Sequence, residues 1–170
     1  MKSAADQTSI PIGDDRMGMR DHYAPVWNDV YTVLVVQFDP PNRKLLVKML
    51  TALGYRAIEA ADGIEALDRI HRQPAPDLMI LAVDLPRMNG IDTVSAVRNL
   101  SSPKRNLPVV AISLDVPQDQ IAQLNEIGVD KFLSRPFDMH ELAEVVSSLL
   151  KGHLEEVPAT ALRSYFGVRS

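Results

Sequence analysis

From residue 31 onward, short apolar runs alternate with longer segments of helical periodicity. The runs are rich in β-branched residues and too short for helices, which predicts strands at 31–36, 56–60, 77–83, 109–113 and 131–133. Between and after the strands, apolar residues recur at spacings of three and four, the pattern of a helix with one buried stripe. These stripes begin at Leu45, Ile64, Ile91, Ile121 and Leu142.

Strict alternation of strands and helices predicts an α/β fold, with a parallel sheet and helices on both of its faces. Sheets of this doubly wound kind place their functional groups at the carboxyl ends of the strands. The residues that follow the predicted strands therefore form the candidate site. They are Gln37, Phe38, Asp39, Ala82, Asp84, Ser113 and Arg135.

Length and composition divide the chain of 170 residues into three parts and narrow its chemistry. Residues 1–30 sustain neither helical nor strand periodicity, which predicts a partly disordered extension before a domain at 31–151 and a tail at 152–170. A formal net charge of −4 argues against nucleic acid as the main partner, and the absence of cysteine excludes thiolate chemistry. No apolar run is long enough for a membrane span or a secretory signal, so a cytoplasmic location is expected.

Several motifs in this order resemble the receiver domain of bacterial two-component response regulators over about residues 31–151. They are Pro76-Asp77-Leu78-Met79-Ile80-Leu81, Leu85-Pro86-Arg87-Met88-Asn89-Gly90, Leu107-Pro108-Val109-Val110-Ala111-Ile112-Ser113 and Lys131-Phe132-Leu133-Ser134-Arg135-Pro136. The resemblance implies a flavodoxin-like (βα)5 fold with strand order 2-1-3-4-5. It also implies a part in phosphorelay signalling, in which receivers take a phosphoryl group from a histidine kinase onto an aspartate.

The positions that carry this chemistry in the family have changed here. The acceptor aspartate stands four residues before the loop proline, and that position is Ala82, whose methyl group cannot attack phosphorus. The acidic pair that holds Mg²⁺ in the family corresponds to Gln37 and Phe38, and phenylalanine offers no oxygen. The family's lysine is Arg135, and Ser113 keeps the phosphate-sensing hydroxyl. The sequence therefore predicts a degenerate receiver that is not an enzyme and has no metal or cofactor.

Two carboxylates could still restore some of this chemistry. Asp39 and Asp84 could bind a divalent ion together, or Asp84 could serve as a substitute acceptor. The simpler interpretation is that Asp39 caps the following helix, and that Asp84 is a solvated loop residue or pairs with Arg135. Arg135 could alternatively bind an anionic small molecule such as a nucleotide messenger.

The resemblance also implies a partner surface. In the family, phosphate turns an aromatic residue of the fifth strand inward, and here that residue is Phe132, which has no hydroxyl. Without phosphate we expect one fixed state, with a surface around 118–127, 131–132 and 140–147 that includes Lys131 and Glu144. The expected occupant is a histidine kinase, another response regulator, or a second copy in a homodimer. The tail at 152–170 could be a docking peptide or could fold back on the domain.

Overall fold

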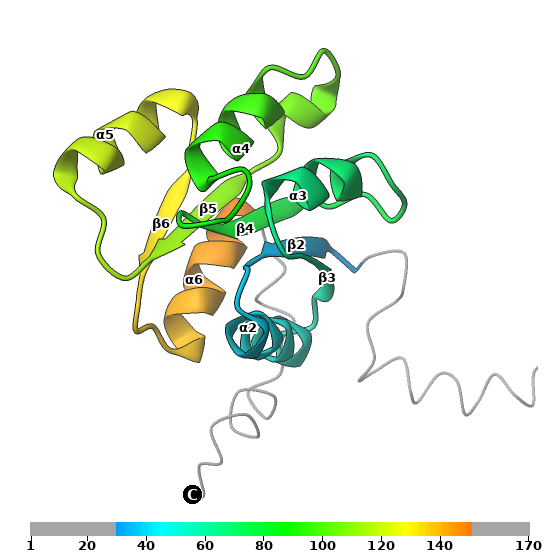
Figure 1. The fold of residues 1–170 in the computed structure, drawn as a ribbon. Helices are drawn as coiled ribbons and strands as arrows, with labels where there is room; N and C mark the ends of the chain where they lie inside the picture. The colour runs from blue at the N-terminus through cyan, green and yellow to red at the C-terminus, as the bar shows by residue number, and fades with distance from the viewer. Residues whose placement is uncertain (1–29, 151–170) are drawn as a thin grey trace, which may run out of the picture. The chain divides into compact units, whose positions relative to one another are not determined.

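The computed structural model describes residues 30–150, which contain five strands and five α-helices (Figure 1). The predicted extension at 1–30, apart from Val30, and the predicted tail at 152–170 lie outside the described residues. Both remain predictions. The elements in chain order are β2 (Thr32–Val36), α2 (Pro40–Ala52), β3 (Arg56–Ala60), α3 (Gly63–Ile70), β4 (Leu78–Ala82), α4 (Gly90–Arg98), a 3-10 turn η2 (Pro103–Asn106), β5 (Val109–Ser113), α5 (Gln118–Ile127), β6 (Lys131–Ser134) and α6 (Met139–Leu149).

The strands form one parallel sheet in the order β3-β2-β4-β5-β6. Numbered by their order in the chain, this is 2-1-3-4-5, so the expected fold class is confirmed. The register pairs Val35 with Ile80 and Leu81 with Ala111, which brings the carboxyl ends of β2, β4 and β5 to the same edge. The predicted strand limits differ from the observed ones by at most one residue at either end.

The sheet is covered on both faces, with α2 and α6 on one side and α3, α4 and α5 on the other (Figure 1). Consecutive residues of β4, such as Met79 and Ile80, enter different cores, because successive strand side chains point to opposite faces. This double burial explains the uninterrupted apolar runs of the central strands. No helix among residues 30–150 is long and apolar enough to cross a membrane.

Short polar side chains fix where the helices begin. Asp39 accepts a hydrogen bond from the Asn42 N–H at 3.1 Å and caps α2, as the simpler interpretation of this residue predicts. Asp138 caps α6 in a capping box with Glu141. Since α2 follows β2 and α6 follows β6, the loops that carry these caps lie at the carboxyl edge of the sheet.

Candidate functional site

A cavity of about 300 Å³ opens at the carboxyl ends of the central strands. It is lined by Gln37, Ala82, Asp84, Ile112, Ser113, Leu114, Asp115 and Arg135. The strand register brings together five of the seven residues that the sequence places at this edge. Phe38 and Asp39 are not among its lining residues.

The last residues of β4 and β5 form part of the cavity wall. Ala82 is the last residue of β4 and presents a half-buried methyl group. Ser113 ends the neighbouring strand β5 and keeps its hydroxyl at the same edge. A serine hydroxyl needs an adjacent base to act as a nucleophile, and no histidine lines this cavity. Ser113 can therefore donate a hydrogen bond at this edge, and the carboxylates that line the cavity are those of Asp84 and Asp115.

The residues around the cavity do not fit a magnesium site. Mg²⁺ takes six oxygen ligands in near-octahedral geometry, usually with one or two carboxylates. Gln37 is buried, and its only side-chain oxygen, Oε1, already accepts a hydrogen bond from the Asp39 N–H at 3.2 Å. Within residues 30–150 no three His, Cys, Asp or Glu side chains gather as metal ligands would. Asp84 and Asp115 are the two carboxylates that line the cavity, and the end of β2 adds only the engaged amide oxygen of Gln37, so the carboxylate pair that the family has on this strand is missing.

Phe38 is not among the residues that line the cavity, which corrects the expectation that it belongs to the pocket. Its side chain is 57% exposed. The backbone beside it is held by Arg43, whose Nη1 donates to the carbonyl oxygens of Gln37 and Phe38 at 2.7 and 3.1 Å. Arg43 in turn forms an ion pair with Glu59 on β3, with Nε and Oε1 2.9 Å apart. The β2–α2 loop is therefore fixed by contacts within the protein.

Arg135 lines the cavity without the ion pair that the sequence suggested. No salt bridge within 4.0 Å joins Arg135 to Asp39 or Asp84 in the described part of the chain. Asp39 is instead used as a helix cap, and Asp84 is an exposed loop residue. Asp115 also lines the cavity and was missed, although it follows β5 by two residues just as Asp84 follows β4. The matching positions of Asp84 and Asp115, each two residues after a strand, are the sequence signal that identifies Asp115 as a candidate site residue.

The predicted switch and interface residues lie on β6 and α6. Phe132 is half-buried and packs against the core on the α3–α5 side of the sheet. Lys131 and Glu144 are exposed, and the Glu144 carboxylate lies 3.7 Å from the His140 ring. The role of these three residues in binding remains a prediction.

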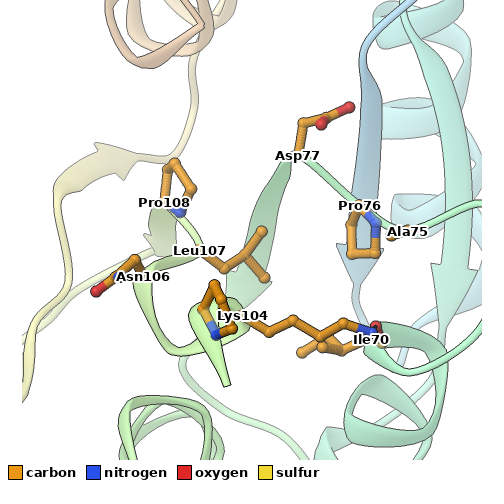
Figure 2. A pocket seen from close by; sticks show the side chains of 9 residues that line it. Ile70, Ala75, Pro76, Asp77, Lys104, Asn106, Leu107 and Pro108 are labelled. Atoms are coloured by element: carbon orange, nitrogen blue, oxygen red, sulfur yellow. Dashed lines mark hydrogen bonds between the residues drawn. The ribbon is translucent and has the colours of Figure 1, made fainter. Parts of the chain in front are cut away.

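A second cavity, of about 290 Å³, lies at the opposite edge of the sheet, where the strands begin (Figure 2). Its two charged residues serve the fold. The Lys104 ammonium donates to the Ile70 carbonyl at 3.0 Å, and the Asp77 carboxylate accepts from the Thr32 N–H at 2.8 Å. Both charged side chains therefore join neighbouring elements, Lys104 to the end of α3 and Asp77 to the start of β2.

An ion pair with a buried carboxylate fixes the β4–α4 loop beside the candidate site. Arg87 has a positive φ of 64°, an uncommon backbone state for a residue with a side chain. Its Nε donates to Asp62 Oδ2 at 2.8 Å, and Asp62 also accepts from the Glu65 N–H as the cap of α3. Burial alone would raise the pKa of Asp62, but the Glu65 N–H and the Arg87 guanidinium outweigh burial and lower the pKa. The charged carboxylate therefore joins the loop to α3.

We expect Asp62→Asn to lower the free energy of unfolding by about 1 kcal/mol at neutral pH, because asparagine keeps the cap but loses the ion pair. This figure allows for the screening of Arg87, which is 60% exposed. A carboxylate with a lowered pKa stabilises the fold above its ordinary pKa of 3.8, and this contribution is lost as the pH falls through the folded value. Urea denaturation should show the difference between wild type and variant shrinking in acid. An equal difference at neutral and acid pH would contradict the ion pair.

Comparisons with known proteins agree with this geometry. The family model described as the response regulator receiver domain matches residues 33–147. The chain is 32% identical over 120 residues to the sensor histidine kinase RcsC of Salmonella typhi, covering 71% of this chain and 12% of that kinase. It is 26% identical over 119 residues to the polar-differentiation response regulator DivK of Brucella anthropi, covering 70% and 95% of the two chains.

Solved structures show the same fold. The receiver domain of sensor histidine kinase PA1611 from Pseudomonas aeruginosa PAO1, which has magnesium coordinated in its active site cleft, matches with a TM-score of 0.65 and 26% identity over 71% of this chain and 98% of that one. The chemotaxis protein CheY4 of Vibrio cholerae matches with the same TM-score, identity and coverage. The chain spans a small fraction of the RcsC kinase but nearly the whole of these single domains. With its strand order, its edge cavity and these matches, the chain belongs to the response regulator receiver family.

Proposed function

We propose that this receiver domain acts in two-component signalling as a stand-alone protein-interaction module that does not depend on phosphorylation. The observation that carries the proposal is the methyl group of Ala82 at the end of β4, where a phosphoacceptor would need a carboxylate. The buried amide of Gln37 and the outward Phe38 support it, because neither supplies a metal-binding carboxylate. On this proposal the chain is a binding protein and not an enzyme.

The partner proposed is a histidine kinase, another response regulator or a second copy of the chain, and the site of action is the cytoplasm. The similarity to the RcsC kinase and to the DivK regulator supports a partner from this signalling system. One fixed conformation suits such a role, since a domain without a phosphorylation step has no covalent signal to change it. The Arg87–Asp62 ion pair and the Arg43 contacts support a fixed state of the two loops beside the cavity.

We expect acetyl phosphate with Mg²⁺ to leave the full chain unmodified, because Ala82 stands in place of the acceptor carboxylate and neither Gln37 nor Phe38 supplies a metal-binding carboxylate. Intact-mass spectrometry after incubation measures this directly. A receiver that retains its aspartate, treated in the same tube, serves as the positive control. A gain of one phosphoryl group on this chain, mapped to Asp84, would contradict the proposal and identify a substitute acceptor.

A second candidate function rests on Arg135, a guanidinium that lines the cavity near Ser113 without an ion pair among residues 30–150. A guanidinium and a hydroxyl at one cavity suit a small anion or a nucleotide. Amide chemical shifts recorded while a nucleoside diphosphate is added without metal separate the two functions. Saturable shifts centred on Ser113 and Arg135 would favour ligand binding, and unchanged spectra would favour the interaction module.

A further inference from the structure

The cavity at the edge where the strands begin has the lining of a small-molecule site (Figure 2). Its volume of about 290 Å³ lies at the lower limit of such sites, which run from about 300 to 1,000 Å³. Four segments meet around it, namely the end of α3, the loop before β4, η2, and the loop between η2 and β5. Most of its lining is apolar, as in sites that bind small organic ligands. The apolar side chains are those of Ile70, Ala75, Pro76, Pro103, Leu107 and Pro108.

The wall of this cavity is largely rigid. Ile70 and Leu107 are buried and belong to the core on the α3–α5 side of the sheet. Three of the lining residues are prolines, whose ring fixes the φ angle and whose nitrogen carries no N–H. The Leu107 carbonyl oxygen already accepts from Arg98 Nη1 at 2.8 Å. The Pro108 carbonyl oxygen accepts from the Met79 N–H at 2.9 Å. A ligand would therefore lose little free energy to ordering this wall, and it would find few backbone groups to bond.

The Lys104 ammonium is the polar group that lies among these apolar side chains. Lys104 is half-buried, which is uncommon for a lysine. Its side chain runs along the cavity to the end of α3, where Nζ donates to the Ile70 carbonyl at 3.0 Å (Figure 2). An ammonium has three N–H donors, and no carboxylate among residues 30–150 forms a salt bridge with this one. The cavity therefore has a positive charge and spare hydrogen-bond donors at one end.

The two other polar side chains of the lining do not offset this charge. The Asp77 carboxylate points away from Lys104 in Figure 2, and its Oδ2 accepts from the Thr32 N–H at 2.8 Å. Asn106 is exposed, and its side chain points away from Lys104 in the same view. The charge that the cavity offers to a ligand is thus that of Lys104 alone, and it favours an anion.

We propose that this cavity binds a small organic acid with one carboxylate and a compact apolar body. The carboxylate accepts hydrogen bonds from the remaining N–H groups of Lys104, and the body lies against Leu107 and the prolines. One lysine matches a single negative charge, whereas a nucleotide phosphate would bring further charges into an apolar cavity without a partner. The proposal is independent of the proposed function, because this cavity lies at the opposite edge of the sheet from Ala82.

The test uses three probes with the same aromatic body, namely phenylacetate, its uncharged analogue phenylacetamide, and the cation phenethylamine. Amide chemical shifts of the full chain, recorded as each probe is added at constant ionic strength, locate the site and give the Kd. Phenylacetate should produce saturable shifts centred on Lys104 and Leu107 with a Kd of about 1 mM, a value that a ligand of about ten non-hydrogen atoms can reach. It should bind at least about tenfold more tightly than phenylacetamide, and phenethylamine should not bind.

Three variants separate the charge from the shape of the cavity. Lys104→Met keeps an apolar side chain but removes the charge, so it should abolish the preference for phenylacetate over phenylacetamide. Lys104→Arg keeps the charge and should keep a preference, which distinguishes loss of the charge from loss of the fold. Ala75→Leu fills part of the cavity and should weaken the binding of both probes by at least about tenfold. Lys48→Met is the matched control, since Lys48 is an exposed lysine of α2 that does not line the cavity, and it should leave the Kd unchanged.

Three results would overturn the proposal. The first is the absence of saturable shifts with phenylacetate at about 10 mM, well above the expected Kd. The second is equal affinity of the wild-type chain for phenylacetate and phenylacetamide, or an unchanged preference in Lys104→Met. The third is a set of shifts centred on Ser113 and Arg135, which would place the acid in the cavity at the carboxyl edge. None of these results depends on the mass measurement, so this cavity can fail as an acid site while the phosphorylation-independent function stands.

Discussion

Ala82→Asp alone should leave the chain unphosphorylated by acetyl phosphate and Mg²⁺, whereas the triple variant Gln37→Asp, Phe38→Asp, Ala82→Asp should gain one phosphoryl group. The single substitution supplies an acceptor, but no metal-binding pair is present to offset the charge of the incoming phosphoryl group. The triple variant gathers three carboxylates at the edge where β2 and β4 end side by side. Intact-mass spectrometry measures the adduct, and titration calorimetry measures Mg²⁺ binding.

The matched control combines Ala82→Asn with the same two aspartate substitutions, Gln37→Asp and Phe38→Asp. Asparagine has the shape of aspartate but cannot accept the phosphoryl group, so this control should bind Mg²⁺ and stay unmodified. Without metal, three converging carboxylates repel one another, and the triple aspartate variant should unfold at a lower temperature than wild type. Added Mg²⁺ should restore part of that loss, because a ligand that binds the folded state stabilises it. Efficient labelling of the single variant would contradict this account of the cavity.

The same cavity shows how far sequence reasoning reaches at a functional site. Strand periodicity predicted which residues end the strands, and parallel pairing is enough to gather Ala82, Ser113 and Arg135 at one edge. Strand periodicity could not predict that the Phe38 side chain is exposed to solvent. The backbone of this loop is held by Arg43, which donates to two loop carbonyls and pairs with Glu59 on another strand. Such bonds join residues that the sequence pattern treats as unrelated loop and helix positions.

The ion pair between Asp62 and Arg87 illustrates the same limit. The capping role of Asp62 is local, and the Asp-Gly-Ile-Glu segment at 62–65 has the pattern typical of a helix start. Its second role joins residues 25 positions apart and depends on the positive φ of Arg87. Neither a periodic pattern nor a propensity specifies that contact, because it follows from how α3 packs against the β4–α4 loop. The fold of residues 30–150 was therefore predictable, and the site only to the level of which residues share an edge.

The packing of α3 against the β4–α4 loop predicts a large loss of stability when the glycine that begins α3 is replaced. Gly63 begins α3, and a Cβ placed there would overlap Thr93 Oγ1 and lie 2.8 Å from the Met88 carbonyl oxygen. We expect Gly63→Ala to lower the free energy of unfolding by about 2–3 kcal/mol, because overpacking a closed contact forces backbone and side chains to move. Alanine's better helix propensity, worth about 1 kcal/mol in a helix interior, offsets little at the first residue. Urea denaturation with an unchanged m-value measures the loss.

A double-mutant cycle with Thr93→Ala separates the steric cause from a general effect of replacing glycine. Thr93 Oγ1 donates to the Asn89 carbonyl at 2.7 Å, so Thr93→Ala alone should cost about 1 kcal/mol. In the double variant the nearest clashing atom is gone, and the two single losses should sum to more than the measured loss. The Met88 carbonyl oxygen still lies 2.8 Å from the new Cβ, so the rescue should be partial. Strict additivity would show that the close approach of α3 to the β4–α4 loop does not determine the requirement for glycine.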